Sequence, residues 1–453
     1  MNQSIKEEIG DVKNIFSKLK KKDLSGNAGQ AIKNSSYQLA ITLVAKIGSL
    51  FFTIIVARLM LPEIYGLYGL ALSTILILGV FSDIGISAAL NTFISKTIDK
   101  LPGKAKGYFI YITKWRIALS ILSILLIILL SKYLALIYYQ KPIYYALLAG
   151  TIYLPIVITQ SHLKSIFISS NNFRPLLVQE IILQILKLTL VPLIIILFLA
   201  KITNIGVYLS WIFLILAACY LIATIYFIWK IKKDKPFKQT RSIDLSDKEQ
   251  KELKRFILPL TVTALSGIFF GYIDQIMLGH YVESAFLGFY QASFNLATSA
   301  AAIVAFSGVA IFPILARLKG KKLERGFRKT RNITIIVSVL AAIFTLILAP
   351  LIIKTIYGPL YSTAITYLRI FSILIITSPL VVLYTTYYTS QKRTKIISIL
   401  LIISTTINII LNYILINIGL HSNMFQAVNG ACMATTISQL VYLGGLVIFK
   451  KRN

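Results

Sequence analysis

The side chains of this sequence that could do chemistry are charged and amide groups set inside long apolar runs. Lys46, Lys187 and Arg369 lie within such runs, and Arg58 lies at the edge of one. Burying a charge in hydrocarbon is costly, so charged residues at membrane depth mark binding sites or paired contacts. We expect these cations to bind an anionic group in a water-filled cleft. Anchoring at the membrane rim is an equal alternative for Arg58, and polar contacts between packed helices are the alternative for the others.

Acidic residues in the same runs could bind a coupling ion or neutralise the cations. Asp83, Glu180 and Asp274 are the carboxylates at membrane depth. Glu180 and Lys164 stand at similar depth on either side of a short turn, which predicts a structural ion pair. Asp274 and Arg369 both lie in the outer halves of their runs, so a pair between them is the alternative to a substrate-binding role of Arg369. Asp83 is near the inner end of its run, which favours a role in holding the adjacent cytoplasmic turn over ion coupling.

Helical spacing gathers the polar residues on single faces of these runs. Gln38, Thr42 and Lys46 follow one another at intervals of four, and a similar stripe leads from Glu180 to Lys187. Residues at such intervals share one face of an α-helix, so each stripe turns away from lipid. The amide and hydroxyl residues expected to line the cleft are Gln38, Thr42, Gln184, Asn295, Asn408 and Asn412.

Other chemistries find little support in the sequence. Cys219 and Cys432 lie far apart in apolar runs, which supports neither a disulfide framework nor a cysteine metal site. The expected outer turns contribute only Glu63 and Glu283 as carboxylates, and a Walker-type phosphate loop is absent. We therefore predict no catalytic residue, no metal site and no cofactor, and we leave coupling to Na⁺ or H⁺ open.

The composition requires a membrane for these elements. Of the 453 residues, 57% are hydrophobic and only 14% are charged, with a formal net charge of +31. An average soluble domain is about 25% charged. A basic excess usually suggests nucleic acid, but this chain is too apolar for a water-soluble nucleic-acid-binding domain. We predict an all-α polytopic membrane protein with no nucleic-acid partner.

Twelve runs are long and apolar enough to cross a bilayer, which takes about 20 residues of helix. They cover residues 35–57, 66–92, 108–130, 143–168, 176–199, 205–229, 256–279, 286–316, 332–353, 361–388, 396–417 and 425–449. Short turns join most of them, and the largest connection is 230–255. We therefore expect about 12 transmembrane helices.

The basic residues fix the predicted orientation. If the N-terminus is cytoplasmic, the inner segments hold 36 of the 47 Lys and Arg residues and the outer turns hold 5. Cationic loops are retained on the cytoplasmic side of a membrane. The sequence predicts a multi-pass protein of the cell (cytoplasmic) membrane with both termini cytoplasmic.

A faint internal repeat suggests two similar halves. Residues 50–52 (LFF) and 268–270 (IFF) occupy matching places in the first and seventh runs. Repeats of six spans are typical of transporters with two pseudo-symmetric lobes around a central cleft. The expected divisions are a cytoplasmic amphipathic segment that lies on the inner leaflet at 1–33, an N-lobe at 34–229, a cytoplasmic linker at 230–255, a C-lobe at 256–449 and a cytoplasmic tail at 450–453.

Several motifs resemble one known family. Residues 56–68 (VARLMLPEIYGLY), 81–86 (FSDIGI), 171–173 (NNF) and 287–290 (LGFY) resemble the corresponding turns of the oligosaccharide/polysaccharide flippases. These flippases form the polysaccharide transporter branch of the multidrug/oligosaccharidyl-lipid/polysaccharide exporter superfamily. The resemblance implies a two-lobed carrier that moves lipid-linked oligosaccharides from the inner to the outer leaflet. The count of twelve spans lacks the extra C-terminal pair of murein-precursor flippases, which argues against that subfamily.

The function expected from these residues is transport by alternating access. The cargo would be an oligosaccharide linked to polyprenyl phosphate or pyrophosphate, for biosynthesis of a cell-surface polysaccharide or glycan. Membrane lipids are expected partners, and a glycan polymerase or glycosyltransferases are candidate ones. A cation-coupled multidrug antiporter of the same superfamily is the nearest alternative. A membrane glycosyltransferase or polymerase is a weaker one, because the outer turns are short.

Overall fold

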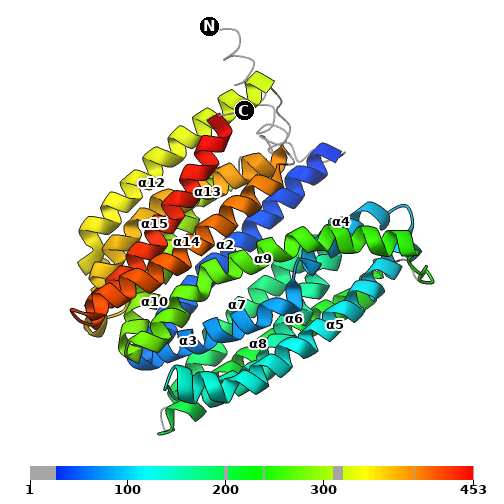
Figure 1. Ribbon diagram of the computed structural model, residues 1–453. Coiled ribbons are helices and arrows are strands. Elements are labelled where there is room, and N and C mark those ends of the chain that lie inside the picture. Colours follow the sequence, from blue (N-terminus) through cyan, green and yellow to red (C-terminus); the bar gives the residue numbers. More distant parts are fainter. Residues whose placement is uncertain (1–26, 198–201, 238–239, 310–319, 392, 452–453) are drawn as a thin grey trace.

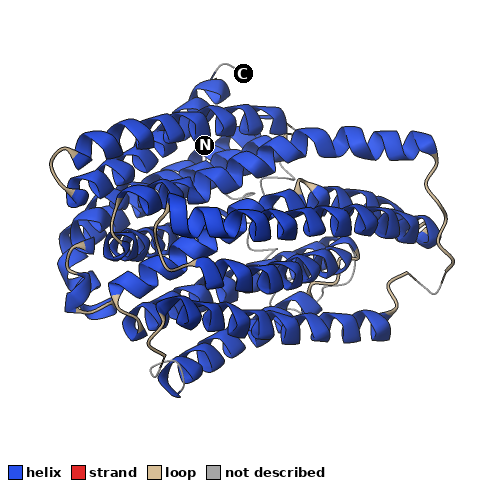
Figure 2. Cartoon of the chain, turned by 60° about the horizontal axis from the view of Figure 1, so that its bottom comes forward, coloured by secondary structure: helices blue, strands red, loops and turns tan. Residues whose placement is uncertain are grey.

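The computed structural model describes residues 27–197, 202–237, 240–309, 320–391 and 393–451. The amphipathic segment expected at 1–33 lies almost wholly outside the described residues. Within them, the chain consists of helices and short connections that run side by side between two ends of the molecule (Figure 2).

The helices coincide with the predicted apolar runs. In chain order they are α2 (Asn27–Leu59), α3 (Pro62–Gly79), the 3-10 helix η1 (Val80–Asp83), α4 (Ile86–Thr97), α5 (Pro102–Lys132), the π-helix η2 (Tyr133–Tyr138), α6 (Tyr144–Ser169), α7 (Arg174–Leu197), α8 (Ile205–Asp234), α9 (Asp247–Tyr281), α10 (Ser284–Val309), α12 (Gly320–Ile356), the 3-10 helix η4 (Pro359–Tyr361), α13 (Ala364–Ser390), α14 (Thr394–Leu420) and α15 (Met424–Lys451). Among the described residues, 11 segments are long and apolar enough to cross a membrane, and α10 matches the remaining predicted run. The predicted all-α polytopic fold is confirmed.

The helices gather in two bundles (Figure 1). In the first, α6 and α7 pack on α8, and α2 packs on α7. In the second, α14 packs on α15, while α13 packs on α10, α12 and α15. The start of α2 and the finish of α15 lie at the same end of the molecule, as an even number of crossings requires (Figure 1). We name this end, which carries the basic connections, the inner end, and the opposite one the outer end.

The bundles meet at the outer end along a seam of small residues between α3 and α10. A Cβ added to Gly66 would lie 2.0 Å from the carbonyl oxygen of Ser284, and one on Gly288 would lie 2.0 Å from that of Pro62. One turn further, Gly69 lies directly against the side chain of Gln291. Small residues let helix backbones approach closely in a membrane, where packing rather than the hydrophobic effect drives association. The seam therefore requires glycine.

The second span is broken near its inner end. Gly85 separates η1 from α4 and has a φ of 81°, in the left-handed region that favours glycine. The break contacts the second half of the chain, since Thr261 Oγ1 of α9 donates to the Ile84 carbonyl at 3.0 Å. The side chain of Leu260 lies where a Cβ of Gly85 would be.

The connection between the halves is fixed to the first bundle. Residues 230–234 extend α8, and 247–255 form the first turns of α9, so the non-helical part of the expected linker is shorter than 230–255. We name its residues 240–246 the strap. The Ile243 amide donates to the Gly103 carbonyl at 2.9 Å, and Ile243 O lies 2.0 Å from the position of a Cβ on Gly107. Lys104 adds an ion pair of 2.7 Å to Glu249, which caps α9.

Gly66→Leu should separate the outer ends of the bundles, because the added side chain cannot fit against the backbone of α10. In a variant whose Cys219 and Cys432 are replaced by alanine, we expect a membrane-impermeant maleimide to label Asn295→Cys from outside several times faster when Gly66→Leu is present. Gly444→Leu is the control, because nothing lies within 4 Å of a Cβ there. Equal labelling rates in the two backgrounds would contradict the role of the seam.

Gly107→Ala should loosen the strap, since the new methyl group would occupy the place of the Ile243 carbonyl. Trypsin should then cleave after Arg241 several times faster in native protein, as judged by the rate at which the full-length band is lost. Gly444→Ala makes the same change at an open position and should leave the rate unchanged. A strap that resists trypsin equally in both variants would show that Gly107 does not hold it.

Candidate transport site

Lys46 lies on the face of α2 that turns towards the second bundle. Further along the same face, Thr53 lies close to Tyr357, and the Ala57 carbonyl accepts a hydrogen bond of 2.9 Å from the Tyr361 hydroxyl. Positions seven and eleven residues apart on an α-helix point within about 20° of one direction. Ala57 is buried by this contact, whereas Lys46 is exposed. The second bundle therefore covers this face of α2 at the outer end, whereas the face is exposed at the depth of Lys46.

The rest of the predicted α2 stripe continues along this open side. Gln38 and Thr42 are exposed and precede Lys46 by two turns and one turn. The opposite side of the helix is closed, because Gly48 packs directly against Gln184 of α7. The structure thus brings Gln38, Thr42 and Lys46 onto one surface between the bundles.

Lys187, by contrast, is enclosed within the first bundle. The residue is 8% exposed, and its Nζ lies 4.4 Å from the centre of the Phe52 ring on α2. Its acidic neighbour is Glu180, whose Oε1 accepts a hydrogen bond of 2.8 Å from Gln184 Nε2. The expectation that Lys187 and Gln184 line an open cleft is wrong. Their stripe faces α2 because α2 and α7 pack along their length, and it forms a buried polar layer there.

Both ion pairs that the sequence suggested are absent among the described residues. The ion pairs found there are Lys104–Glu249, Arg116–Asp83, Lys230–Asp234 and Lys450–Glu324. Lys164 and Glu180 do not meet, because Glu180 is buried against Gln184 and near Lys187 of its own helix, whereas Lys164 is half-buried on α6. Asp274 and Arg369 do not meet because Asp274 points into the second bundle and Arg369 is exposed on the outside of α13, one turn from exposed Ile373.

Arg58 joins the two bundles at the outer end. Its Nε donates to the Ile356 carbonyl at 2.6 Å, and its Nη2 donates to the Thr355 carbonyl. These are carbonyls of the last turn of α12, where a cation is favourable because the helix dipole is negative there. Arg58 thus caps a helix of the opposite bundle.

Asn295 and Lys141 also hold the outer end together. Asn295 Nδ2 donates to the Tyr65 hydroxyl across the seam at 2.9 Å, which occupies an amide expected to line the cleft. Lys141, in the turn before α6, donates from Nζ to the Gly279 carbonyl at 2.8 Å. Burial lowers the pKa of the Lys141 ammonium, and nearby Glu283 acts in the opposite direction.

Asp274 forms the centre of a polar site inside the second bundle. The residue is 3% exposed, and its carboxylate accepts hydrogen bonds from Tyr290 Oη at 2.8 Å, Thr435 Oγ1 at 2.5 Å and Asn412 Nδ2. Asn408, one turn before Asn412, is fully buried as well. The Oδ1 atoms of both asparagines have no hydrogen-bond partner among the described residues. Carboxylate, amide and hydroxyl oxygens are ligands of hard cations, and a carboxylate without an ionic partner can also take a proton.

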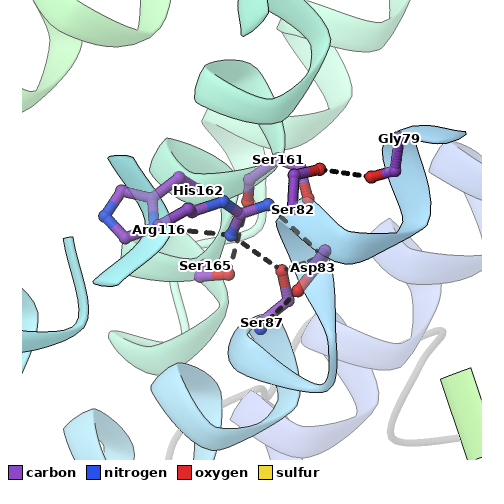
Figure 3. Close-up of polar contacts among 8 residues, drawn as sticks. All are labelled: Gly79, Ser82, Asp83, Ser87, Arg116, Ser161, His162 and Ser165. Atoms are coloured by element: carbon purple, nitrogen blue, oxygen red, sulfur yellow. Dashed lines mark hydrogen bonds and ion pairs between the residues drawn. The ribbon is translucent and has the colours of Figure 1, made fainter. Parts of the chain in front are cut away.

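Asp83 belongs to a network at the inner end of the first bundle (Figure 3). It accepts from the Ser87 amide at 2.8 Å and forms an ion pair of 3.3 Å with Arg116 Nη2. Arg116 Nη1 also lies 3.4 Å from Nδ1 of His162. The other ring nitrogen of His162, Nε2, lies 2.7 Å from Thr113 Oγ1. These contacts fix the break in the second span to α5 and α6. The carboxylate serves this structural network.

Sequence reasoning missed several members of these sites. Tyr290 and Thr435 complete the Asp274 site. Tyr290 belongs to the family-like segment 287–290, but neither residue was marked as a site residue by its spacing. Tyr65 and Gln275 belong to the seam, where Gln275 Nε2 donates to Gln291 Oε1 at 2.7 Å. The glycines at 66 and 288, each followed closely by an aromatic residue, were the available signal for that contact.

Solved structures of several membrane transporters share the fold of this chain. The chain superposes on the lipid II flippase MurJ in an inward closed conformation with a TM-score of 0.69, at 16% identity over 92% of this chain and 87% of that one. It superposes on an inward-facing multidrug resistance transporter of the MATE family, of the MOP superfamily, with a TM-score of 0.67, at 14% identity over 92% and 99% of the chains. An outward-facing MATE transporter gives a TM-score of 0.57 at 14% identity, over 95% and 96%. Identities this low show a shared fold only.

Comparison with protein families is more specific. No curated protein matches significantly. Residues 259–414 match the MatE family. Residues 31–319, more than half of the chain, match the polysaccharide biosynthesis protein family. The chain therefore belongs to the polysaccharide biosynthesis protein family, a family of membrane transporters in the MOP superfamily.

Proposed function

We propose that this protein is a flippase that moves oligosaccharides linked to polyprenyl phosphate or pyrophosphate from the inner to the outer leaflet of the cell membrane. The observation that carries the proposal is the exposed Lys46, on the α2 face that the second bundle covers at the outer end. Such a cation would replace water around an anionic phosphate while the prenyl chain stays in lipid. The family to which the chain belongs supports a cargo used in polysaccharide biosynthesis.

The arrangement of the bundles supports alternating access that begins from the inner side. The outer end is closed by the seam and by Arg58, whereas α2 is exposed from Gln38 to Lys46. A higher TM-score to an inward-facing than to an outward-facing relative, 0.67 against 0.57, agrees with this state. Opening the seam while the inner ends close would present the same Lys46 surface to the outer leaflet.

The membrane potential favours net outward transport of an anionic cargo. An anion moving outward across an inside-negative membrane gains about 2.3 kcal/mol per charge for each 100 mV. Return of the empty, positively charged site towards the negative inner side is the step on which this gain falls, because the loaded site is neutralised by its cargo. We propose that Na⁺ or H⁺ bound at Asp274 assists this return, because the buried carboxylate has neutral donors around it and two free amide oxygens beside it. Both termini would lie in the cytoplasm, where glycan polymerases or glycosyltransferases are candidate partners.

Multidrug antiport is the second candidate, favoured by the MatE match and by the uncompensated Asp274. The two functions differ in the charge that the open site should prefer. A flippase needs Lys46 for an anionic headgroup, whereas a drug carrier would gain from its removal because its substrates are cationic.

Lys46→Gln should lower flipping of polyprenyl-pyrophosphate sugar in proteoliposomes roughly tenfold, since a contact between a cation and a charged oxygen contributes about 1.5 to 3 kcal/mol. Lys132→Gln, which removes an exposed lysine at the outer end of α5, is the matched control and should flip at the wild-type rate. Undiminished flipping in Lys46→Gln would sink the cationic-site proposal. Export of a cationic dye that rises in the same variant would favour the antiporter.

Asp274→Asn should abolish the response of transport to a Na⁺ or pH gradient while keeping the shape of the side chain. The amide cannot take a proton or neutralise a cation, so we expect gradient-driven flipping to fall roughly tenfold towards the rate without a gradient. Glu252→Gln, an exposed carboxylate on the first turns of the same helix, should retain the response. A gradient response that survives in Asp274→Asn would place the coupling ion elsewhere.

A further inference from the structure

The first bundle has a pocket at its inner end that the transport site does not use. It lies between the start of α2 and the turn that joins α6 to α7, and its volume is about 450 Å³. Ligand pockets commonly measure about 300 to 1,000 Å³. The residues that line it are Lys33, Asn34, Tyr37, Ser170, Asn171, Asn172, Phe173 and Arg174.

The lining is chemically one-sided. It holds the cations Lys33 and Arg174, amides, hydroxyls and one phenylalanine ring, and it includes no carboxylate. The acid beside it is Asp234, whose Oδ2 accepts from Asn172 Nδ2 at 3.3 Å. Asp234 is itself paired with Lys230 at 2.8 Å, so its charge is compensated. Two cations surrounded by hydrogen-bond donors match an oxygen-rich anion such as a phosphate.

The walls of the pocket are held by packed structure. Asn171 adopts a φ of 53°, and the Asn172 amide donates to the Phe167 carbonyl at 3.0 Å, so the turn closes tightly over α6. Below the turn, Phe167 and Phe227 pack with ring centres 5.1 Å apart in a cluster that includes Ile41 of α2. The cluster fixes the start of α2 beside the turn, which brings Lys33 and Arg174 to one pocket.

Neighbouring side chains place the pocket at the level of lipid headgroups. Trp229, near the inner end of α8, is 54% exposed, and Lys233 Nζ lies 5.2 Å from the centre of its ring. Tyr226 stands one turn before it, 6.0 Å away between ring centres. Exposed tryptophan and tyrosine near a basic helix end mark the interface between membrane and water. Basic pockets between helices on the cytoplasmic side bind lipid headgroups.

We propose that this pocket binds the phosphate group of a lipid in the inner leaflet. Two lipids share that chemistry, an anionic phospholipid and a polyprenyl phosphate. The second source rests on the proposed function and would make the pocket a loading site, because Lys33 precedes Lys46 on the same helix by about 20 Å. The first source would make it a regulatory or anchoring site.

The test is lipid binding by the full-length protein in neutral detergent, followed by native mass spectrometry. The probes are phosphatidylglycerol and undecaprenyl phosphate, with zwitterionic phosphatidylcholine as reference. Lys33→Gln/Arg174→Gln should weaken binding of at least one phosphate lipid roughly tenfold, since each cation near a lipid surface contributes to anion binding. Lys100→Gln/Arg331→Gln removes the same charge at the same end of the molecule and should bind as wild type. Lys33→Arg/Arg174→Lys keeps the charge and should restore binding, which separates the site from a folding defect.

Each possible result of this experiment either supports the lipid-phosphate site or overturns it. Equal weakening by the pocket variant and the charge-matched control, or no weakening by either, overturns the proposal. The lipid that loses affinity identifies the source. Because binding is measured without transport, a chain that binds phosphatidylglycerol here but flips no sugar lipid would retain this site and refute the proposed function. A protein that flips sugar lipid, but whose binding of phosphate lipids does not depend on Lys33 and Arg174, would refute this site and retain the proposed function.

Discussion

The close approach of α3 and α10 is the contact on which the rest of the structure depends. Two helices in a membrane can touch backbone to backbone only where side chains are missing, and Gly66, Gly69 and Gly288 supply that stripe. Arg58 and Tyr361 extend the same closure to α2 and α12. At the inner end α9 also contacts the first bundle, where Thr261 donates to the Ile84 carbonyl. On the face that the second bundle covers at the outer end, α2 stays exposed from Gln38 to Lys46.

The same geometry sorts the membrane-embedded cations into different roles. Lys46 and Lys187 are each set in a polar helical stripe, yet one faces the space between the bundles and the other faces a neighbouring helix. Inside the bundle, the Phe52 ring and the charge of Glu180 compensate Lys187. Lys46 has an exposed surface instead and is free to compensate something else. Burial, rather than residue type, separates a structural lysine from a candidate binding residue.

The sequence predicted the positions of the helices far better than it predicted which helices pack against each other. Bilayer thickness dictates the length of a span, so hydropathy located every helix from α2 to α15 within a few residues at most ends. Spacing also grouped Asn408 with Asn412, because intervals of four fall on one helix face. It could not show which helix that face meets. For this reason the ion pairs suggested for Lys164 and Arg369 are not formed. Tyr290 and Thr435 could be recognised as partners of Asp274 only from the packing of α9, α10, α14 and α15.

The packing also joins the Asp274 site to the seam. Asp274 and Gln275 are consecutive on α9, and Tyr290 and Gln291 are consecutive on α10. The first member of each pair meets in the second bundle, where the Tyr290 hydroxyl donates to Asp274. The second members meet at the seam, where Gln275 donates to Gln291 beside Gly69.

Two sites coupled in this way need an element whose position both of them bias. Here α10 is that element, since a change of charge at Asp274 alters its bond to Tyr290, and the next residue of the helix rests on α3. A bound cation or proton would weaken the hold of the carboxylate on the tyrosine, while the empty site would keep α10 in its present register. Under the proposed ion coupling, occupancy of Asp274 would act on the outer closure through adjacent residues of α9 and α10.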